Sequence, residues 1–364
     1  MRGQVAPGVT EDQVGERIEQ MRRRPQKFRD ERITMAHGAG GKASRALVEG
    51  LVVPLLSNPA LEQLSDAGLL TVNGTRLAMT TDAYVVRPLR FPGGSIGELA
   101  VNGTINDLAV SGARPLSLSV ALVLEEGLPA EVLRGEIAAI ADAATAAGVP
   151  VITGDTKVVE RGKCDQMYII TTGVGVVDER ADLSPLRVRP GDKVLVSGTV
   201  GDHGIAILLA RGDLDLEADV RSDTQPLWNL AEALLCACGE GLHCMRDATR
   251  GGVATVLNEI ALAAEVGIVL EESRVPVRPE VMGAGEILGI DPLYVANEGK
   301  LVAFVAPEHA EAALAAMRSL PSGAEAAIVG EVRDEPPGRV LGRTSFGGHR
   351  LIDMLVGDPL PRIC

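Results

Sequence analysis

Residues 95–124 read SIGELAVNGTINDLAVSGARPLSLSVALVL, a helix pattern followed at once by a strand pattern. Ser95 and Glu98 have the spacing of a capping box, which predicts that a helix begins here, and Gly112 is suited to end it. The alternating run Ser117–Leu124 predicts a strand. A long helix joined to a strand by a few residues is a unit of layered α/β folds.

The same alternation continues through most of the chain from Ile33 onward. Segments rich in Val, Ile and Thr predict strands, and longer segments rich in Ala, Leu and Glu predict helices. The other predicted strands are Leu77–Thr81, Val149–Thr153, Tyr168–Val177, Lys193–Ser197, Gly267–Leu270 and Lys300–Val305. The predicted helices are Ala43–Leu56, Ile96–Ser111, Ala130–Ala147, Asp202–Arg211, Pro226–Ala237, Val253–Ala264 and Pro307–Leu320. This mixture predicts an α/β domain together with an α+β domain.

The length of 364 residues suits two domains. The first residues are polar and charged and predict a mobile extension. The proline-containing stretch Ala181–Asp192 separates two strand-rich segments and predicts the domain boundary, while two late prolines predict an extended arm. The expected divisions are an extension over 1–32, domains over 33–180 and 181–345, and an arm over 346–364.

Composition excludes several classes of function. The net charge is −14 and aromatic residues make up 2%, which argues against a surface that binds nucleic acid or anionic membranes. The longest uncharged stretches, such as 143–154 and 166–177, are too short to span a bilayer. Five cysteines, an odd number, and a charged N-terminal region predict a cytoplasmic protein without a disulfide framework.

The loop HGAGGK at residues 37–42 precedes a predicted helix. Glycines let backbone N–H groups converge on an anion, and a helix N-terminus adds positive potential. The loop is not a Walker A motif, because Ala36 and Ala43 stand where that motif needs Gly and Ser or Thr. A plain glycine-rich turn is the alternative. The candidate phosphate ligands are Gly38, Gly40, Gly41 and Lys42.

Four aspartates lie at the ends of apolar segments or beside glycines. Asp82 follows one predicted strand, and Asp155 follows Val149–Thr153, which reads as a buried strand. Asp107 lies on the predicted helix, and Asp247 precedes another. Any one of them is more often a cap or turn residue. Four together favour a cleft for Mg²⁺ and a nucleotide, because Mg²⁺ prefers oxygen ligands and bridges carboxylates to phosphates.

Lys157 and Glu298 are candidates for proton transfer. Lys157 comes two residues after Asp155, and Glu298 lies in a turn before a predicted strand. A lysine and a glutamate that meet at one site can accept a proton and stabilise charge. From spacing alone, solvated surface charges are the alternative.

Cys364 is the last residue of the sequence, on a stretch that Pro359 and Pro361 keep extended. It is not a prenylation signal, which needs the cysteine four residues from the end. A thiol on such an arm can carry an acyl-type group and present it to more than one site.

Together these motifs resemble the HypE family of hydrogenase maturation factors, the carbamoyl dehydratases of the PurM-like superfamily related to aminoimidazole ribonucleotide synthetase. The resemblance runs from about Ile33 to Cys364, and its most specific part is the final PRIC at 361–364. It implies a PurM-like two-domain fold, a homodimer formed through the N-terminal domains, and a flexible C-terminal arm. ATP and Mg²⁺ would bind in a cleft near the dimer interface.

The resemblance also implies roles for the candidate residues. Metal binding falls to Asp82, Asp107 and Asp155; nucleotide binding to Gly38, Gly40, Gly41, Lys42, Asn106, Thr156 and Asp247; and catalysis to Cys364, Glu298 and Lys157.

The activity that the resemblance implies is dehydration of a carbamoyl group attached to the Cys364 thiol. The carbamoyltransferase HypF would attach the group, and ATP would drive its conversion to a thiocyanate. Cyanide would then pass to iron on a HypC–HypD complex. Two alternatives remain open: a synthetase that acts on a free substrate such as selenide or a purine intermediate, and a scaffold without catalysis whose Cys364 only docks a partner or metal.

Overall fold

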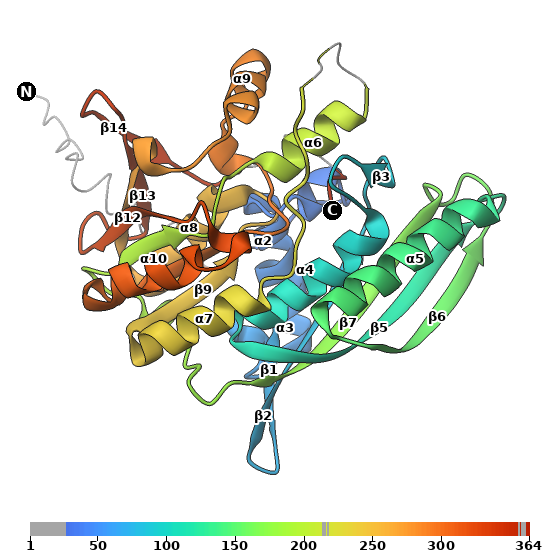
Figure 1. Ribbon diagram of the computed structural model, residues 1–364, viewed down its shortest axis with the longest axis horizontal. Coiled ribbons are helices and arrows are strands. Elements are labelled where there is room, and N and C mark those ends of the chain that lie inside the picture. Colours follow the sequence, from blue (N-terminus) through green and yellow to red (C-terminus); the bar gives the residue numbers. More distant parts are fainter. Residues whose placement is uncertain (1–26, 213–215, 217, 356, 358–361) are drawn as a thin grey trace, which may run out of the picture.

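The computed structural model describes residues 27–212, 216, 218–355, 357 and 362–364. The described part of the chain forms two sheets of five and seven strands, with helices packed on them (Figure 1). None of the helices in this part is long and apolar enough to cross a bilayer.

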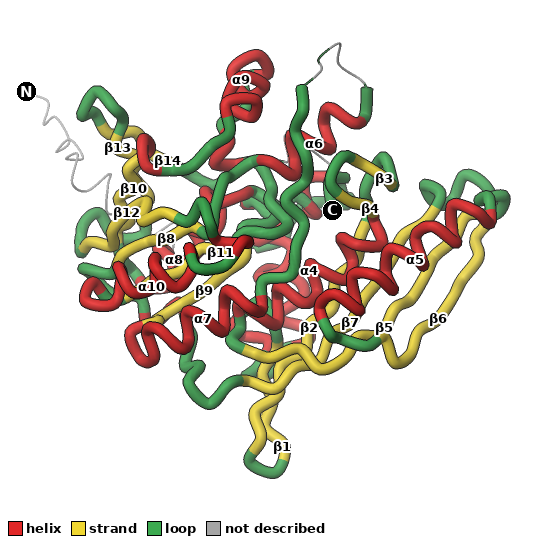
Figure 2. Tube along the Cα trace, viewed as in Figure 1, coloured by secondary structure: helices red, strands yellow, loops and turns green. Residues whose placement is uncertain are grey.

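The first sheet has the strand order β1-β2-β7-β5-β6. Helices α4 (Ile96–Val110) and α5 (Ala130–Ala147) lie across one of its faces, as Figure 2 shows, and no helix among the described residues covers the other, open face. The strands are β1 (Gly68–Val72), β2 (Thr75–Tyr84), β5 (Ala113–Glu125), β6 (Val151–Val159) and β7 (Met167–Val177). Beside it, β3 (Arg90–Phe91) and β4 (Gly94–Ser95) form a small two-stranded sheet.

Helix α4 begins where the sequence predicts, but the capping box does not form. Ser95 is the N-cap residue and makes no side-chain capping hydrogen bond. The Glu136 carboxylate, which belongs to α5, accepts the Gly97 N–H at 3.1 Å instead. A side chain from a neighbouring helix therefore satisfies a free backbone N–H of the first turn of α4. The spacing of residues within α4 cannot reveal that partner.

Strand β6 differs from the buried strand that its apolar residues predict. It lies at the edge of the sheet, and its side chains are exposed, including Ile152 at 67% and Val158 at 67%. A continuous apolar run is typical of a strand covered on both sides, whereas the described chain covers only one side of this sheet. Asp155 also lies inside this strand rather than after it, and Asp82 lies inside β2.

The second sheet has the order β14-β13-β10-β12-β8-β11-β9. Helices α7 (Trp228–Cys238) and α10 (Ala310–Arg318) pack on one face, and α8 (Gly252–Ala264) packs on the other. The remaining helices of this half are α6 (Asp202–Ala210) and α9 (Pro279–Leu288). The strands are β8 (Lys193–Val196), β9 (Leu242–Asp247), β10 (Gly267–Glu271), β11 (Leu301–Val305), β12 (Ala327–Arg333), β13 (Arg339–Arg343) and β14 (His349–Ile352). Strand β14 lies within 346–364, the span predicted to be an extended arm. It pairs with β13, so this part of the span belongs to the second sheet.

The region before the first sheet is helical, as predicted. A short helix α2 (Lys42–Leu47) continues through a π-helical stretch into α3 (Val53–Leu56). Residues 1–26 of the predicted extension lie outside the described residues. Phe28 and Asp30 both contact His37: the Phe28 and His37 ring centroids lie 5.5 Å apart, and the Asp30 carboxylate lies 2.9 Å from His37 Nε2.

Helix α4 lies between the two halves of the molecule. Its Leu108 and Ala109 share a buried cluster with Leu230 and Leu234 of α7. Its Ile96, Leu99 and Ala100 share another buried cluster with α6. Side chains on α4 are thus held against both sheets, which positions the site described next.

Candidate functional site

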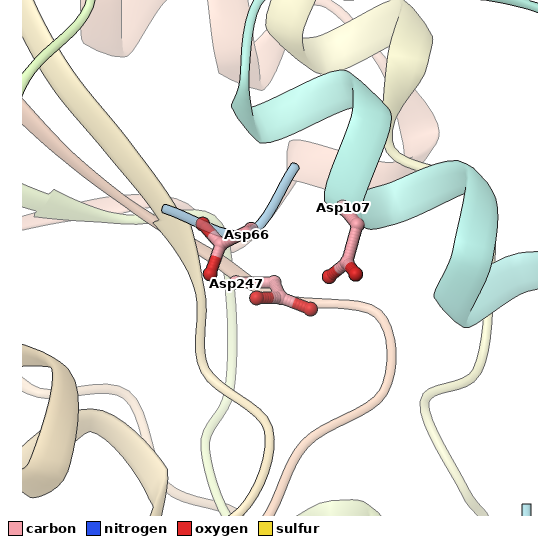
Figure 3. Close-up of side chains that lie close together, drawn as sticks. All are labelled: Asp66, Asp107 and Asp247. Carbon is pink, nitrogen blue, oxygen red and sulfur yellow. The ribbon is translucent and has the colours of Figure 1, made fainter. Parts of the chain in front are cut away.

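Three carboxylates meet at one point between the two sheets (Figure 3). Asp66 lies two residues before β1, Asp107 lies on α4, and Asp247 is the last residue of β9. One oxygen from each lies within 4.8 Å of the others. Asp107 and Asp247 are predicted site residues that the fold brings together, and Asp66 joins them although the sequence analysis does not select it.

Burial makes these carboxylates hard to ionise. It raises the pKa of Asp66 to about 6 and that of Asp247 to about 8, and it raises the pKa of Asp107 well above its ordinary value. Repulsion from neighbouring carboxylates, including Asp82, adds to each shift. The Arg246 guanidinium, 3.2 Å from Asp66, opposes the shifts of Asp66 and Asp247.

The cluster fits a divalent cation. Three carboxylates this close repel one another when all are charged, and a bound cation removes that repulsion. Carboxylate oxygens from separate elements are also the ligands that Mg²⁺ prefers. Asp82 lies within electrostatic range of all three, on the helix-covered face of β2.

Glu298 is a second buried acid in the same region. It is 3% exposed, and its Oε1 has no hydrogen-bond partner among the described residues. Burial raises its pKa well above the ordinary value, Asp247 and Asp223 raise it further, and Arg250 opposes the shift. Such a carboxylate holds a proton more tightly than usual, which suits a general base.

The Glu298 backbone is fixed from two directions. Its N–H donates to Asp223 Oδ1 at 3.0 Å, and its carbonyl accepts from Asn106 Nδ2 at 3.0 Å. Asn106 Nδ2 also donates to the Gln225 carbonyl, and its Oδ1 accepts from Leu227 N–H. Asn106 therefore ties α4 to the second half of the chain, and its nucleotide contact stays a prediction.

The end of the chain is docked beside β2. Val85 N–H donates to Cys364 O at 2.8 Å, and Arg87 N–H donates to Arg362 O at 3.3 Å. The alternating pattern is that of a short antiparallel pairing. Arg362 also pairs with Asp165.

Arg250 connects Cys364 to the acidic residues. The negative charge of Cys364 is the largest cause that raises the pKa of Arg250, and Asp82 and Glu298 contribute as well. The thiol-bearing residue, Glu298 and Asp82 therefore all lie within electrostatic range of one guanidinium group. Tyr84, whose hydroxyl donates to Asp82 at 3.3 Å, belongs to the same group of side chains.

The glycine loop lies against Arg250, whose Nη1 donates to the Gly38 carbonyl at 3.4 Å. A Cβ atom on Gly40 would come within 2.8 Å of Arg250, and one on Gly41 would come within 2.3 Å of the Leu355 carbonyl. Gly40 also has a positive φ of +76°. Both its backbone conformation and the close approach of Arg250 therefore favour glycine at this position. Lys42 pairs with Asp353 at 2.9 Å. The predicted phosphate contacts of the loop stay predictions, but its position next to Arg250 agrees with them.

Asp155, Thr156 and Lys157 do not join this cluster. They lie on β6, three strands away from β2, so about 14 Å separates the two backbones at about 4.8 Å per strand. Asp155 and Lys157 project from the open face, whereas Asp82 lies on the helix-covered face. Their salt bridge of 3.0 Å is exposed, with Lys157 at 70%. Their predicted roles are therefore not met within one chain.

The sequence analysis misses Asp66, Arg250, Tyr84 and Asp223. Asp66 and Asp223 precede an apolar segment, whereas Asp82 and Asp155 follow predicted strands. Arg250 lies in the stretch ATRGG after Asp247, where an arginine beside two glycines was the available signal.

Two family models match the chain. The one described as the N-terminal domain of AIR synthase related protein matches residues 64–177, and the one described as its C-terminal domain matches residues 189–342. These spans correspond to the two sheets, so the PurM-like fold that the sequence predicts is confirmed.

Relatives with known names are similar over nearly the whole chain. Carbamoyl dehydratase HypE of Rhodobacter capsulatus is 54% identical over 340 residues, which are 93% of this chain and 99% of that protein. A crystal structure of a HypE–HypF complex matches with a TM-score of 0.81 at 44% identity, covering 85% of this chain and all of that one. A crystal structure of HypE in complex with ATP matches with a TM-score of 0.77 at 47% identity. The match covers 92% of this chain and 100% of that one.

Proposed function

The chain belongs to the HypE family of carbamoyl dehydratases, which act in hydrogenase maturation, and on that premise we propose its reaction in detail. The substrate is an S-carbamoyl group on Cys364, and ATP drives its dehydration to a thiocyanate. The product supplies the cyanide ligands of iron in [NiFe]-hydrogenases. The observation that carries the proposal is the docked residue Cys364, which shares Arg250 with Glu298 and Asp82.

The chemistry balances as follows. The carbonyl oxygen of the S-carbamoyl group takes the γ-phosphoryl group of ATP, and ADP leaves. The nitrogen then loses both of its protons, the C–O bond breaks, phosphate departs, and S–C≡N remains. The oxygen removed from the carbamoyl group ends in the phosphate, so the net change is loss of one water coupled to ATP hydrolysis.

Residues of this chain divide that work. Glu298, with its raised pKa and unpartnered oxygen, accepts a proton from the carbamoyl nitrogen. Asp66, Asp107 and Asp247 would hold Mg²⁺, with Asp82 beside them, and the bound ion would neutralise phosphate charge. The glycine loop at 37–42 and Asp247 contact the nucleotide.

Two partners follow from the family. The solved HypE–HypF complex supports HypF as the carbamoyltransferase that loads Cys364. A HypC–HypD complex is the proposed acceptor of the cyanide. Both exchanges require Cys364 to leave its docked position, and the reaction takes place in the cytoplasm.

A homodimer completes the proposal. The open face of the first sheet carries exposed apolar side chains such as Met79 at 49% and Leu116 at 39%. Exposed apolar patches of this kind mark interaction surfaces. A second copy on this face would also bring its own Asp155 and Lys157, which the first chain leaves on the open side, toward the interface.

Intact mass spectrometry tests the reaction. The chain is incubated with the carbamoyltransferase and carbamoyl phosphate, and then with ATP and Mg²⁺. We expect a carbamoyl adduct on the C-terminal peptide that loses the mass of one water only after ATP is added.

The controls are two cysteine variants. Cys364→Ala should form no adduct yet retain ATP binding, whereas Cys236→Ala, which changes another accessible thiol, should behave like the unchanged chain. An adduct that persists unchanged in the presence of ATP and Mg²⁺ would refute the proposed dehydration.

A further inference from the structure

His203 is a buried histidine that no step of the proposed reaction uses. It lies in the first turn of α6, is fully buried, and meets the Phe91 ring edge-on at 5.6 Å. Both of its ring nitrogens are hydrogen-bonded. Nε2 lies 2.6 Å from the Ile363 carbonyl oxygen, and Nδ1 lies 2.8 Å from Ser222 Oγ.

These contacts fix the tautomer of the ring. A carbonyl oxygen can only accept, so Nε2 carries the proton and donates it to Ile363. Nδ1 must then accept from the Ser222 hydroxyl, whose oxygen in turn accepts the Thr224 N–H at 3.2 Å. Burial lowers the pKa of His203, which keeps the ring neutral and this arrangement intact.

The residue before the thiol is therefore held from both halves of the molecule. On the side of the first sheet, the backbone of Val85 and Arg87 binds Cys364 O and Arg362 O. On the side of α6, His203 binds Ile363 O, and Arg211 Nη2 binds Arg362 O at 2.7 Å.

The Ile363 side chain adds a hydrophobic anchor. It is 3% exposed and belongs to the buried cluster that contains Tyr84 from the first sheet and Ile205 from α6. Because its side chain is packed and its carbonyl is hydrogen-bonded, Ile363 is held in one position. That position fixes where the chain continues into Cys364.

We propose that His203 is a positioning residue that holds Cys364 in the register needed for dehydration. It acts through the Ile363 carbonyl and does not touch the reacting group. This inference rests on the proposed function for its catalytic consequence, but its structural core, the docking of residues 362–364, can be measured without any turnover.

Two substitutions separate positioning from mere packing. His203→Leu fills the space but removes the donor, whereas His203→Gln can still present an amide N–H near the position of Nε2. Each variant is first loaded with the carbamoyl group, and a single turnover is then followed with saturating ATP. We expect dehydration to slow about tenfold in His203→Leu, as loss of one buried hydrogen bond would give, and about threefold or less in His203→Gln.

Alkylation of the unloaded chain gives the second readout. Docked Cys364 is half-buried, so its alkylation, followed peptide by peptide, should accelerate about tenfold when docking is lost in His203→Leu, while the exposed Cys236 reacts at an unchanged rate. ATP affinity and loading by the carbamoyltransferase should stay as in the unchanged chain. The matched control is His349→Leu, which alters an exposed histidine on β14.

The outcomes are distinguishable. If the unchanged chain dehydrates its carbamoyl group and His203→Leu does so within twofold, with Cys364 equally shielded, the inference is wrong and the proposed function stands. If the unchanged chain does not dehydrate, the proposed function fails and alkylation alone decides whether His203 docks Cys364. If His203→Leu does not fold, Ser222→Ala takes its place. That substitution removes the hydroxyl that donates to Nδ1, so the proton need no longer stay on Nε2, and the rate of Cys364 alkylation must rise for the inference to survive.

Discussion

Glu298 and Asp247 lie within electrostatic range of each other, and removal from water is the first cause of the raised pKa of each. Arg250 and Arg246 reduce these shifts without cancelling them. Burial disfavours the charged form of a carboxylate, so the group binds a proton more tightly than it does in water. At the scale of single residues, the site therefore contains one acid suited to proton transfer and a separate group that needs a cation.

Glu298→Gln tests the first of these roles. The amide keeps the shape and the backbone contacts of Glu298 but cannot accept the proton, so we expect nitrile formation to slow by about 10²-fold or more. Nucleotide affinity should change little. Single-turnover mass spectrometry on the loaded chain and calorimetric titration with ATP measure the two quantities. Equal losses in both would instead make Glu298 part of the nucleotide site.

The acidic cluster predicts a pH dependence of stability. The folded-state pKa values of Asp66 and Asp247, about 6 and about 8, lie above the ordinary 3.8. The folded chain therefore binds more protons than the unfolded chain between about pH 4 and pH 8, and stability falls as the pH rises through this range. Each pKa unit corresponds to about 1.4 kcal/mol, so thermal unfolding without divalent cations should show a clear decline.

Mg²⁺ should reverse that decline. The stabilisation that it gives in thermal unfolding should be larger at pH 8 than at pH 5, because protons compete with the cation for the same oxygens. Asp66→Asn should reduce both the pH dependence and the Mg²⁺ response, whereas Asp142→Asn on the exposed face of α5 should alter neither. A Mg²⁺ response that survives Asp66→Asn and Asp107→Asn unchanged would locate the cation elsewhere.

At the scale of elements, α4 and β6 show opposite outcomes for sequence patterns. The helix pattern at Ile96–Ser111 is confirmed by α4, in which every residue except Glu98 and Asp107 is buried. The apolar run at the start of β6 predicts a covered strand, and the described chain leaves it uncovered. The pattern of β6 is explained if another molecule covers it.

The oligomeric state tests that explanation. Light scattering after size-exclusion chromatography should give the mass of two chains, and the double variant Met79→Glu and Leu116→Glu should give the mass of one. Charges on the open face would lose solvation in the interface, which costs several kcal/mol each. Leu186→Glu is the matched control, since it is 76% exposed on the connection between the sheets. A double variant that keeps the mass of two chains would place the interface elsewhere.

At the scale of the whole molecule, the site depends on contacts between distant segments. The cluster joins residues 66, 107 and 247, and the docked Cys364 adds the far end of the chain. The two sheets are held together by α4 and by buried clusters that draw on both halves. Movement of one half against the other would therefore change the cation site and the docking of the thiol at the same time.

Sequence patterns were sufficient for most of the helices, for seven of the strands and for several site residues, but they predicted neither helix α9 nor strands β1, β9, β12, β13 and β14. Local periodicity predicts the helices. Four site residues were selected because a charged or reactive side chain lies on a predicted helix, before a helix, in a turn or at the last position: Asp107, Asp247, Glu298 and Cys364. The patterns failed where a partner lies far away in the chain. Glu136 satisfies the start of α4, and Asp66 completes the acidic cluster; neither is near its partner in sequence.

What the sequence by itself determined is most of the helices, seven of the strands, the family and the thiol on which the reaction is proposed to occur, because these depend on local periodicity and on short runs of residues. Only the tertiary structure decided which carboxylates face one another, that Asp155 and Lys157 lie on the opposite face of a sheet from Asp82, and that His203 holds the residue before Cys364. The physical reason is that a pKa, a cation site or a docked thiol depends on distances of a few ångströms between segments that lie far apart in the sequence, and those distances are set by packing.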